Sequence, residues 1–253
     1  MLVVKLGGAI LTRRGGSRVL EHSWCDWLPE LLGRHDGQLC LVHGLGTFGR
    51  AWMPLYDGPS ATIGGERALL ARTIQADLRS LHDQVVACLQ PMGRTLRSFD
   101  PQSLFRCHAG DITDGWPGPI AASLAAGEVP VLYGGTVLDD DGTYSIVSSD
   151  AIVEFVAREM PAKQVIWLSD VPGVFVDGPD GTREVAPVLE RAHLDRLSLI
   201  GDDDGDVTGG MRGKLRSAFR LLEHGVTSRI VSGRDVPAVR AALAGEPAGT
   251  FIG

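Results

Sequence analysis

The stretch Gln38–Trp52 reads QLCLVHGLGTFGRAW and joins a short apolar run to a cluster of glycines. The run Leu39–Val42 has the length and composition of a buried strand. The glycines that follow, Gly44, Gly46 and Gly49, have the Gly-x-Gly-x-x-Gly spacing with which a backbone approaches the phosphates of a dinucleotide. NAD is therefore the first ligand to consider.

The residues after these glycines argue against NAD. A dinucleotide site needs a helix after the glycines and then a second strand that ends in Asp or Glu about 20 residues further on. Here the segment 50–59 contains two prolines, and no second strand precedes the helical segment that begins at Glu66. We interpret Gly44–Gly49 as an anion-binding turn, and a dehydrogenase stays only as an alternative that an NAD(H) binding test would exclude.

Strand-like and helix-like segments alternate along the chain. Short apolar runs occur at Leu2–Val4, Leu39–Val42, Val129–Tyr133, Val165–Leu168 and Arg229–Val231. Segments of helical period occur at Glu66–Leu89, Ser149–Glu159, Met211–Glu223 and Val236–Leu243. This alternation predicts an α/β fold, a mainly parallel sheet with helices on both faces.

Two segments interrupt the alternation. Thr136–Leu138 and Tyr144–Val147 flank Asp139–Gly142, whose Asp-Gly pair predicts a β-hairpin. Val174–Val176 runs into a second turn-rich excursion at 177–181. Ligands of such sheets bind beyond the carboxyl ends of the strands, so we expect both excursions to border a site. The acidic stretch 201–206 is most simply a solvated loop.

Composition limits the partners and the compartment. The chain has 253 residues and a net charge of −7 with a pI near 5.5, which argues against nucleic acid as a partner. The N-terminus has no signal-peptide pattern and no apolar stretch approaches 18 residues, so we expect a cytoplasmic protein without a membrane segment. Cys25, Cys40, Cys88 and Cys107 show no zinc-site spacing, which predicts reduced cysteines and no metal site.

Lysine is rare and is placed selectively. Of 24 cationic residues 21 are Arg, and the three lysines are Lys5, Lys163 and Lys214. Lys5 opens Lys5-Leu-Gly-Gly8 after the first strand, and Lys214 ends Thr208-Gly-Gly-Met-Arg-Gly-Lys214 at a helix start. Ammonium groups next to exposed backbone N–H groups suit polyphosphate, although no Walker-type sequence is present.

The carboxylate of Asp150 is a further candidate beside the two lysines and the glycine turns. Ser148-Ser-Asp150 begins the helix Ser149–Glu159, where any of the three side chains is a possible N-cap and Asp150 is also a possible partner for the two lysines. Phosphoryl transfer needs cations and donors around the phosphates, usually with Mg²⁺, and little covalent chemistry from the protein. Together these motifs indicate a kinase.

The order of these motifs resembles the amino acid kinase superfamily over nearly the whole chain. Within it, VHGLGTFGR, VPVLYGGTVLDDDGTYSIVSSD and ALAGEPAGTFI look most like isopentenyl phosphate kinases, with fosfomycin kinases as near relatives. The resemblance implies a three-layer αβα fold over residues 1–253 and usually a homodimer. It also implies a phosphoryl-acceptor lobe at about 1–160 and a lobe for ATP and Mg²⁺ at about 161–253.

The resemblance also implies roles for individual residues. Lys5 and Lys214 would stabilise the transferring phosphoryl group, and Asp150 would organise them. The acceptor would contact a set drawn from the glycine turns and their neighbours: Gly7, Gly8, Arg14, Gly44, Leu45, Gly46, Gly49, Arg50, Gly134 and Ser149. ATP would contact Lys5, Ser169, Asp170, Gly173, Val174, Gly209, Gly210 and Lys214, and its own phosphates would hold the Mg²⁺.

The departures from the family pattern fall on the acceptor side. Isopentenyl phosphate kinases have His at the position of Arg50, Lys at Arg14, Gly at Leu45 and usually Asp at Gly135. An ionised phosphate oxygen is already a nucleophile, whereas its charge must be neutralised, and Arg suits that task. We expect a small anionic acceptor, a phosphate monoester such as isopentenyl phosphate. A phosphonate, another small acid, and a non-catalytic nucleotide or anion sensor are the alternatives.

Overall fold

The computed structural model describes residues 1–13, 15, 18–52, 55, 62–63, 67–177, 182–190 and 210–253. Within them, one sheet has eight strands in the order β13-β15-β14-β10-β1-β2-β7-β4. In this sheet all neighbouring strands are parallel except β14 and β15, which are antiparallel. The strands are β1 (Leu2–Leu6), β2 (Leu39–His43), β4 (Leu96–Phe99), β7 (Val129–Tyr133), β10 (Gln164–Ser169), β13 (Val188–Leu189), β14 (Thr227–Ser232) and β15 (Thr250–Ile252).

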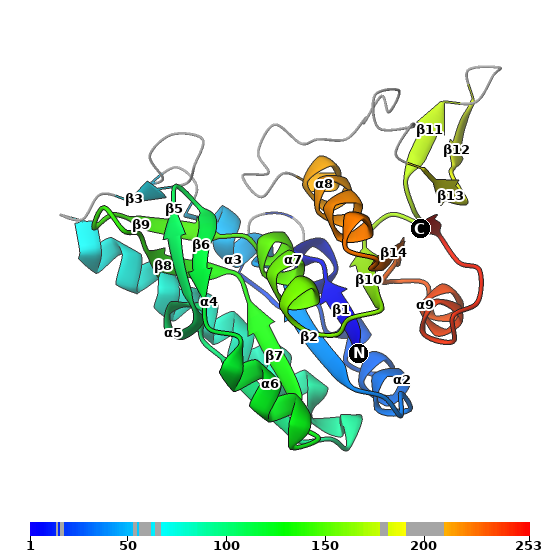
Figure 1. Ribbon diagram of the computed structural model, residues 1–253, viewed down its shortest axis with the longest axis horizontal. Coiled ribbons are helices and arrows are strands. Elements are labelled where there is room, and N and C mark those ends of the chain that lie inside the picture. The colour runs from blue at the N-terminus through cyan, green and yellow to red at the C-terminus, as the bar shows by residue number, and fades with distance from the viewer. Residues whose placement is uncertain are drawn as a thin grey trace.

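Alternation along the strands divides the core into two layers. On β1, Leu2, Val4 and Leu6 pack on one face of the sheet, while Val3 packs on the other. The first face is covered by α1 (Gly8–Leu11), α2 (Leu28–Gly33), α4 (Ala68–Leu89) and α9 (Val236–Leu243). The second is covered by α6 (Gly118–Ala125), α7 (Ser149–Glu159) and α8 (Gly210–Glu223), of which Figure 1 shows α7 and α8 on the near side. The predicted three-layer α/β fold is confirmed.

The helix boundaries follow from their caps. Helix α7 spans the predicted residues because the Ser148 hydroxyl accepts a hydrogen bond from the Ala151 amide at 3.0 Å. Helix α9 begins as predicted because the Asp235 carboxylate accepts from the Ala238 amide at 3.1 Å. In the part of the chain that the structure describes, every helix is too short or too polar to cross a membrane.

Small sheets extend beyond the main one. The predicted hairpin forms from β8 (Gly135–Leu138) and β9 (Tyr144–Val147), and β3 (Thr62–Ile63) joins it. The second excursion pairs β11 (Phe175–Asp177) with β12 (Arg183–Val185). Several short elements were not predicted from the sequence, and four of them lie near the hairpin or the glycine turns. They are α3 (Gly46–Arg50), α5 (Pro101–Leu104), and the strands β5 (Phe105–His108) and β6 (Asp111–Gly115), which form a further hairpin.

The prediction of four reduced cysteines is wrong for two of them. Cys25 and Cys88 form a disulfide with their Cα atoms 5.1 Å apart. Cys25 ends the short 3₁₀ helix η1 (His22–Trp24), and Cys88 lies in the last turn of α4. The two are separated by 63 residues, so their proximity is a product of the tertiary fold that sequence spacing does not reveal. Cys40 and Cys107 are free, as predicted, and both are buried.

Candidate functional site

The predicted motifs gather at one edge of the sheet. Strands β2, β1, β10 and β14 are parallel neighbours, so their carboxyl ends meet there. Gly7 and Gly8 follow β1, Gly44 follows β2, and Asp170 follows β10. The carboxyl edge of a parallel sheet is where such folds bind ligands, which makes this edge the candidate site.

A buried ion pair lies at this edge. Lys5 faces the layer of α7 because it shares the strand face of Val3. Its Nζ atom lies 2.6 Å from Oδ1 of Asp150 in the first turn of α7. A carboxylate is favourable there because the helix N-terminus carries partial positive charge. The fold thus brings Lys5 and Asp150 into contact and fixes an ammonium group beside the glycine turns.

The turns after β1 and β2 are in direct backbone contact. A Cβ atom added to Gly8 would lie 2.5 Å from the Gly46 nitrogen, and one added to Gly44 would lie 2.7 Å from the Gly8 nitrogen. Gly46 also has a left-handed φ of 53°. Thr12, which no sequence motif indicates, links the turns, since its hydroxyl donates to the Gly8 carbonyl at 3.1 Å and accepts from the Thr47 amide at 2.9 Å.

Two buried histidines support the second turn. Burial lowers the pKa of His43 to about 3 and that of His82 to about 4, so both rings are neutral near pH 7. Nδ1 of His43 lies 3.0 Å from the Gly44 carbonyl oxygen and must donate to it. Nε2 of His43 is then an acceptor, and Nδ1 of His82 donates to it at 3.0 Å. The Tyr133 ring stacks on both imidazoles.

The network continues to the hairpin. The Tyr133 hydroxyl donates to Asp100 at 2.9 Å, and the Gln75 amide donates to the same carboxylate at 3.2 Å. The Gln75 oxygen accepts from the Thr136 amide at 2.9 Å. A Cβ atom added to Gly135 would meet that oxygen at 2.7 Å. The Gln75 side chain therefore occupies the space beside position 135, which gives a packing reason for glycine there.

Of the two arginines expected on the acceptor side, the structure describes Arg50 but not Arg14. Arg50 ends α3 with an exposed side chain, and the described part of the chain offers it no ion-pair partner. Arg18, which was not predicted, lies with its guanidinium 4.6 Å from the centre of the Trp52 ring. Asp77 receives a hydrogen bond from the Trp52 indole at 2.8 Å and pairs with Arg18 at 3.0 Å. Arg14 lies outside the described residues.

The remaining acceptor-side residues pack around the turns. Leu45 is buried, and its side chain limits the space at both Gly49 and Gly134. Ser149 is buried at the first position of α7, beside Asp150. Leu45 thus fills the centre of the turn with an apolar group.

The predicted nucleotide residues lie at the same edge, near the end of β10. Ser169 is buried, and Asp170 is half-buried directly after it. The Val174 amide donates to the Thr250 hydroxyl at 2.8 Å, and a Cβ atom added to Gly173 would meet that hydroxyl at 2.6 Å. The strand β15 therefore holds this loop in place.

Lys214 lies on the helix next to that of Asp150. Helices α7 and α8 pack side by side (Figure 1). The Lys214 ammonium is half-buried and donates to the Gly210 carbonyl at 3.2 Å, one turn earlier on α8. Gly210 has a left-handed φ of 50° at the start of the helix, and Gly209 lies outside the described residues.

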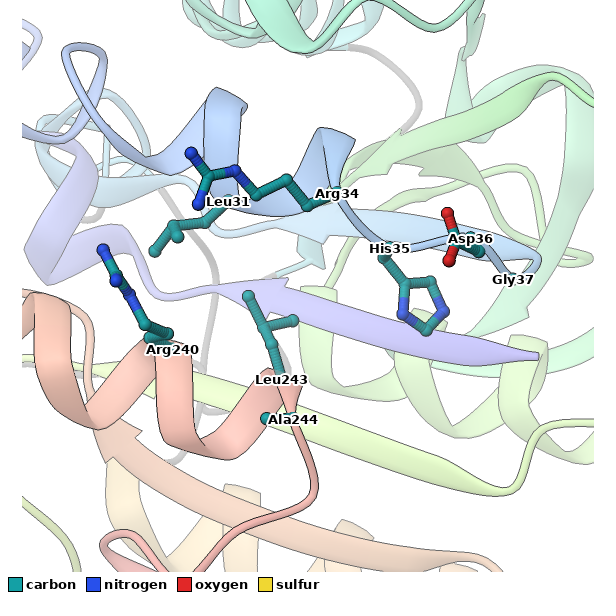
Figure 2. A pocket seen from close by; sticks show the side chains of 8 residues that line it. All are labelled: Leu31, Arg34, His35, Asp36, Gly37, Arg240, Leu243 and Ala244. Carbon is teal, nitrogen blue, oxygen red and sulfur yellow. The ribbon is translucent and has the colours of Figure 1, made fainter.

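A separate pocket of about 410 Å³ lies between α2 and α9. Figure 2 shows Arg34 and Arg240 at one end of it and His35 toward the other. Residues 34–37 precede β2, so this pocket is at the amino end of that strand, opposite the glycine turns. Its arginines are useful controls for cations of the candidate site.

Comparison with known proteins agrees with this arrangement. Residues 1–232 match the amino acid kinase family. The chain is 31% identical to the isopentenyl phosphate kinase of Methanothermobacter thermautotrophicus, covering 97% of this chain and 96% of the relative. It is also 31% identical to the acetylglutamate kinase of Solibacter usitatus, over 98% and 97% of the two chains. A crystal structure of isopentenyl phosphate kinase superimposes with a TM-score of 0.81 at 27% identity and full coverage of both chains. The chain therefore belongs to the amino acid kinase family and is a phosphotransferase.

Proposed function

We propose that this kinase transfers the γ-phosphoryl group of ATP to a phosphate monoester resembling isopentenyl phosphate and forms a diphosphate. The observation that carries the proposal is the buried Lys5–Asp150 pair beside two glycine turns in contact. The ammonium and the backbone N–H groups of the turns stabilise charge on the transferring phosphoryl group. Lys214 is the second cation, supplied from α8.

The donor set fits a polyphosphate carrying Mg²⁺. The two glycine turns pack backbone against backbone, and glycine-rich turns without side chains suit close approach of phosphate oxygens. Asp150 is engaged by Lys5, so ATP phosphates rather than this carboxylate would hold the ion. Mg²⁺ bound to ATP supplies neutralisation of the β- and γ-phosphate oxygens. Residues 1–160 would then hold the acceptor and residues 161–253 the nucleotide.

The acceptor assignment rests on charge. Arg50 presents an exposed guanidinium at the end of the turn formed by Gly44–Gly49. A phosphate monoester brings its own nucleophilic oxygen, so the chain must neutralise and orient it rather than deprotonate it. A carboxylate acceptor is the second candidate, because a relative at the same identity is named acetylglutamate kinase. A phosphonate would satisfy the same cation.

ADP release over a panel of acceptors tests the proposal. The panel holds isopentenyl phosphate, dimethylallyl phosphate, other alkyl phosphates, fosfomycin and N-acetylglutamate, each with ATP and Mg²⁺. We expect release with an alkyl phosphate and a decrease in kcat of about 100- to 1,000-fold in Lys214→Ala. Lys163→Ala is the matched control, since it removes the exposed lysine between α7 and β10. Absence of release with every acceptor would support the sensor alternative instead.

The same proposal includes a homodimer that acts in the cytoplasm. The resemblance to amino acid kinases is its support. Sedimentation equilibrium at several protein concentrations tests the oligomeric state, and a mass of one chain throughout would contradict it.

A further inference from the structure

Three side chains that bind soft metals meet outside the kinase site. The ligand atoms of His22, Cys25 and Cys88 all lie within 4.8 Å of one another. Two come from the η1 turn and one from the end of α4. We propose that the reduced protein binds one Zn²⁺ through Nδ1 of His22 and the two thiolates, and that the Cys25–Cys88 disulfide is the alternative, metal-free state of the same site.

Local geometry brings His22 and Cys25 together. Side chains three residues apart eclipse in a 3₁₀ helix. The Cys25 amide donates to the His22 carbonyl at 2.9 Å, which closes such a turn, and Sγ of Cys25 lies 3.9 Å from Nδ1 of His22. Trp24 between them is buried and anchors the turn in the core. The ligand pair is therefore held on a fixed piece of backbone.

The third ligand stands on an equally fixed element. Cys88 lies between the buried residues Val85 and Leu89 near the end of the 22-residue helix α4. Both cysteines pack against the apolar core with half-buried side chains, while His22 is exposed and its Nδ1 already lies near the Cys25 sulfur. The site is thus rigid on the thiolate side and open to incoming metal.

The chemistry of the set suits zinc. Two thiolates and one imidazole are typical Zn²⁺ ligands, and the two negative sulfurs balance the charge of the ion, with water as the fourth ligand. Binding replaces two S–H bonds with two Zn–S bonds and releases two protons. On oxidation, an added low-molecular-weight disulfide accepts two electrons: its own S–S bond breaks to give two thiolates, an S–S bond forms between Cys25 and Cys88, and Zn²⁺ leaves.

The other two cysteines do not share these properties. Cys40 and Cys107 are fully buried in the opposite layer of the core. Burial raises the pKa of the Cys107 thiol to about 12 and raises that of Cys40 further. Neither forms thiolate near neutral pH, so they serve as internal controls.

The test is a zinc titration of the full chain after reduction and anaerobic removal of the reductant. A chromophoric zinc chelator competes for the metal, and elemental analysis gives the stoichiometry. We expect one zinc per chain, loss of binding in Cys25→Ser and Cys88→Ser, and a decrease in affinity of more than about tenfold in His22→Ala. Treatment with oxidised glutathione should release the metal. Cys107→Ala and His224→Ala should bind as the wild type does.

His22→Ala keeps the proposal testable if a serine variant fails to fold, because it retains both thiols. Cobalt substitution adds a second readout, since thiolate ligands give an intense near-ultraviolet charge-transfer band. Reduced wild type that retains no zinc would overturn the proposal. Equal retention by wild type and Cys25→Ser would also overturn it, and neither result bears on the kinase assignment.

Discussion

The ammonium of Lys5 lies 2.6 Å from the Asp150 carboxylate, and the two side chains are only 5% and 6% exposed. Removal of one partner leaves the other charge buried without compensation, which costs about 3–5 kcal/mol in such pairs. The pair is also the feature on which the proposed phosphoryl transfer depends. Its two roles, in stability and in turnover, are separable by experiment.

Asp150→Asn should therefore lower the free energy of unfolding by about 3–5 kcal/mol and lower kcat as well. Urea unfolding and ADP release measure the two effects. Glu30→Gln is the control, because it breaks the exposed pair of Arg34 and Glu30 and should cost less than about 1 kcal/mol. An Asp150→Asn protein as stable and as active as the wild type would contradict both roles.

Thr12→Val should weaken the contact between the two glycine turns at nearly constant volume. The variant removes the acceptor of the Thr47 amide and the donor to the Gly8 carbonyl, which should cost about 1–3 kcal/mol. The apparent KM for the acceptor should rise with it. Thr73→Val removes an exposed hydroxyl bond to the Leu69 carbonyl and should change neither quantity. A Thr12→Val enzyme with wild-type stability would show that the hydroxyl is dispensable.

The buried histidines should make the protein less stable in mild acid. Their pKa values are lowered to about 3 and about 4, whereas unfolded histidine titrates near 6.5. Between about pH 6.5 and 4 the unfolded chain binds more protons, so stability is lost as the pH falls. His82→Gln should reduce the loss between pH 7 and 5 by about 2 kcal/mol.

Urea midpoints at the two pH values measure this change. His224→Gln, at an exposed position at the end of α8, should keep the wild-type pH dependence. If His82→Gln and the wild type lose stability in parallel, the neutral state of His82 does not contribute.

Arg50→Ala should raise the acceptor KM by about 10- to 100-fold and leave the KM for ATP unchanged, because a charge-assisted hydrogen bond contributes about 1.5–3 kcal/mol. Initial-rate kinetics with each substrate varied in turn provide the measurement. Arg240→Ala removes a guanidinium from the pocket between α2 and α9 and should have no effect. An unchanged acceptor KM in Arg50→Ala would remove Arg50 from the acceptor site.

Local signals explain what the sequence predicted well. The helix Ser149–Glu159 is correct at both ends because its cap and its apolar period are encoded within a few residues. The hairpin around Asp139–Gly142 is correct because Asp-Gly fixes the turn, where Gly142 has a φ of 83°. β4 was missed because Arg97 and Ser98 are exposed and break the apolar pattern of a strand.

Contacts between distant residues explain what the sequence did not predict. His43 and His82 are 39 residues apart, and nothing in their local sequence indicates a shared hydrogen bond. The same holds for Cys25 and Cys88. Arg18 lies over the Trp52 ring although the two residues are far apart in the sequence. Glycines, lysines and an acidic residue in the first turn of a helix indicated the candidate site, whereas its supporting network depends on the folded chain.

The backbone contact between Gly8, Gly44 and Gly46 limits which substitutions the two turns can accept. Because no side chain separates the two turns, a side chain added at Gly8 or Gly44 displaces the opposite turn, and the backbone here cannot be altered one residue at a time. If the turns bind the acceptor as proposed, a new acceptor requires replacement of the side chains around them rather than of the glycines. The glycine contact therefore couples the two turns, so that neither backbone can change its course without the other.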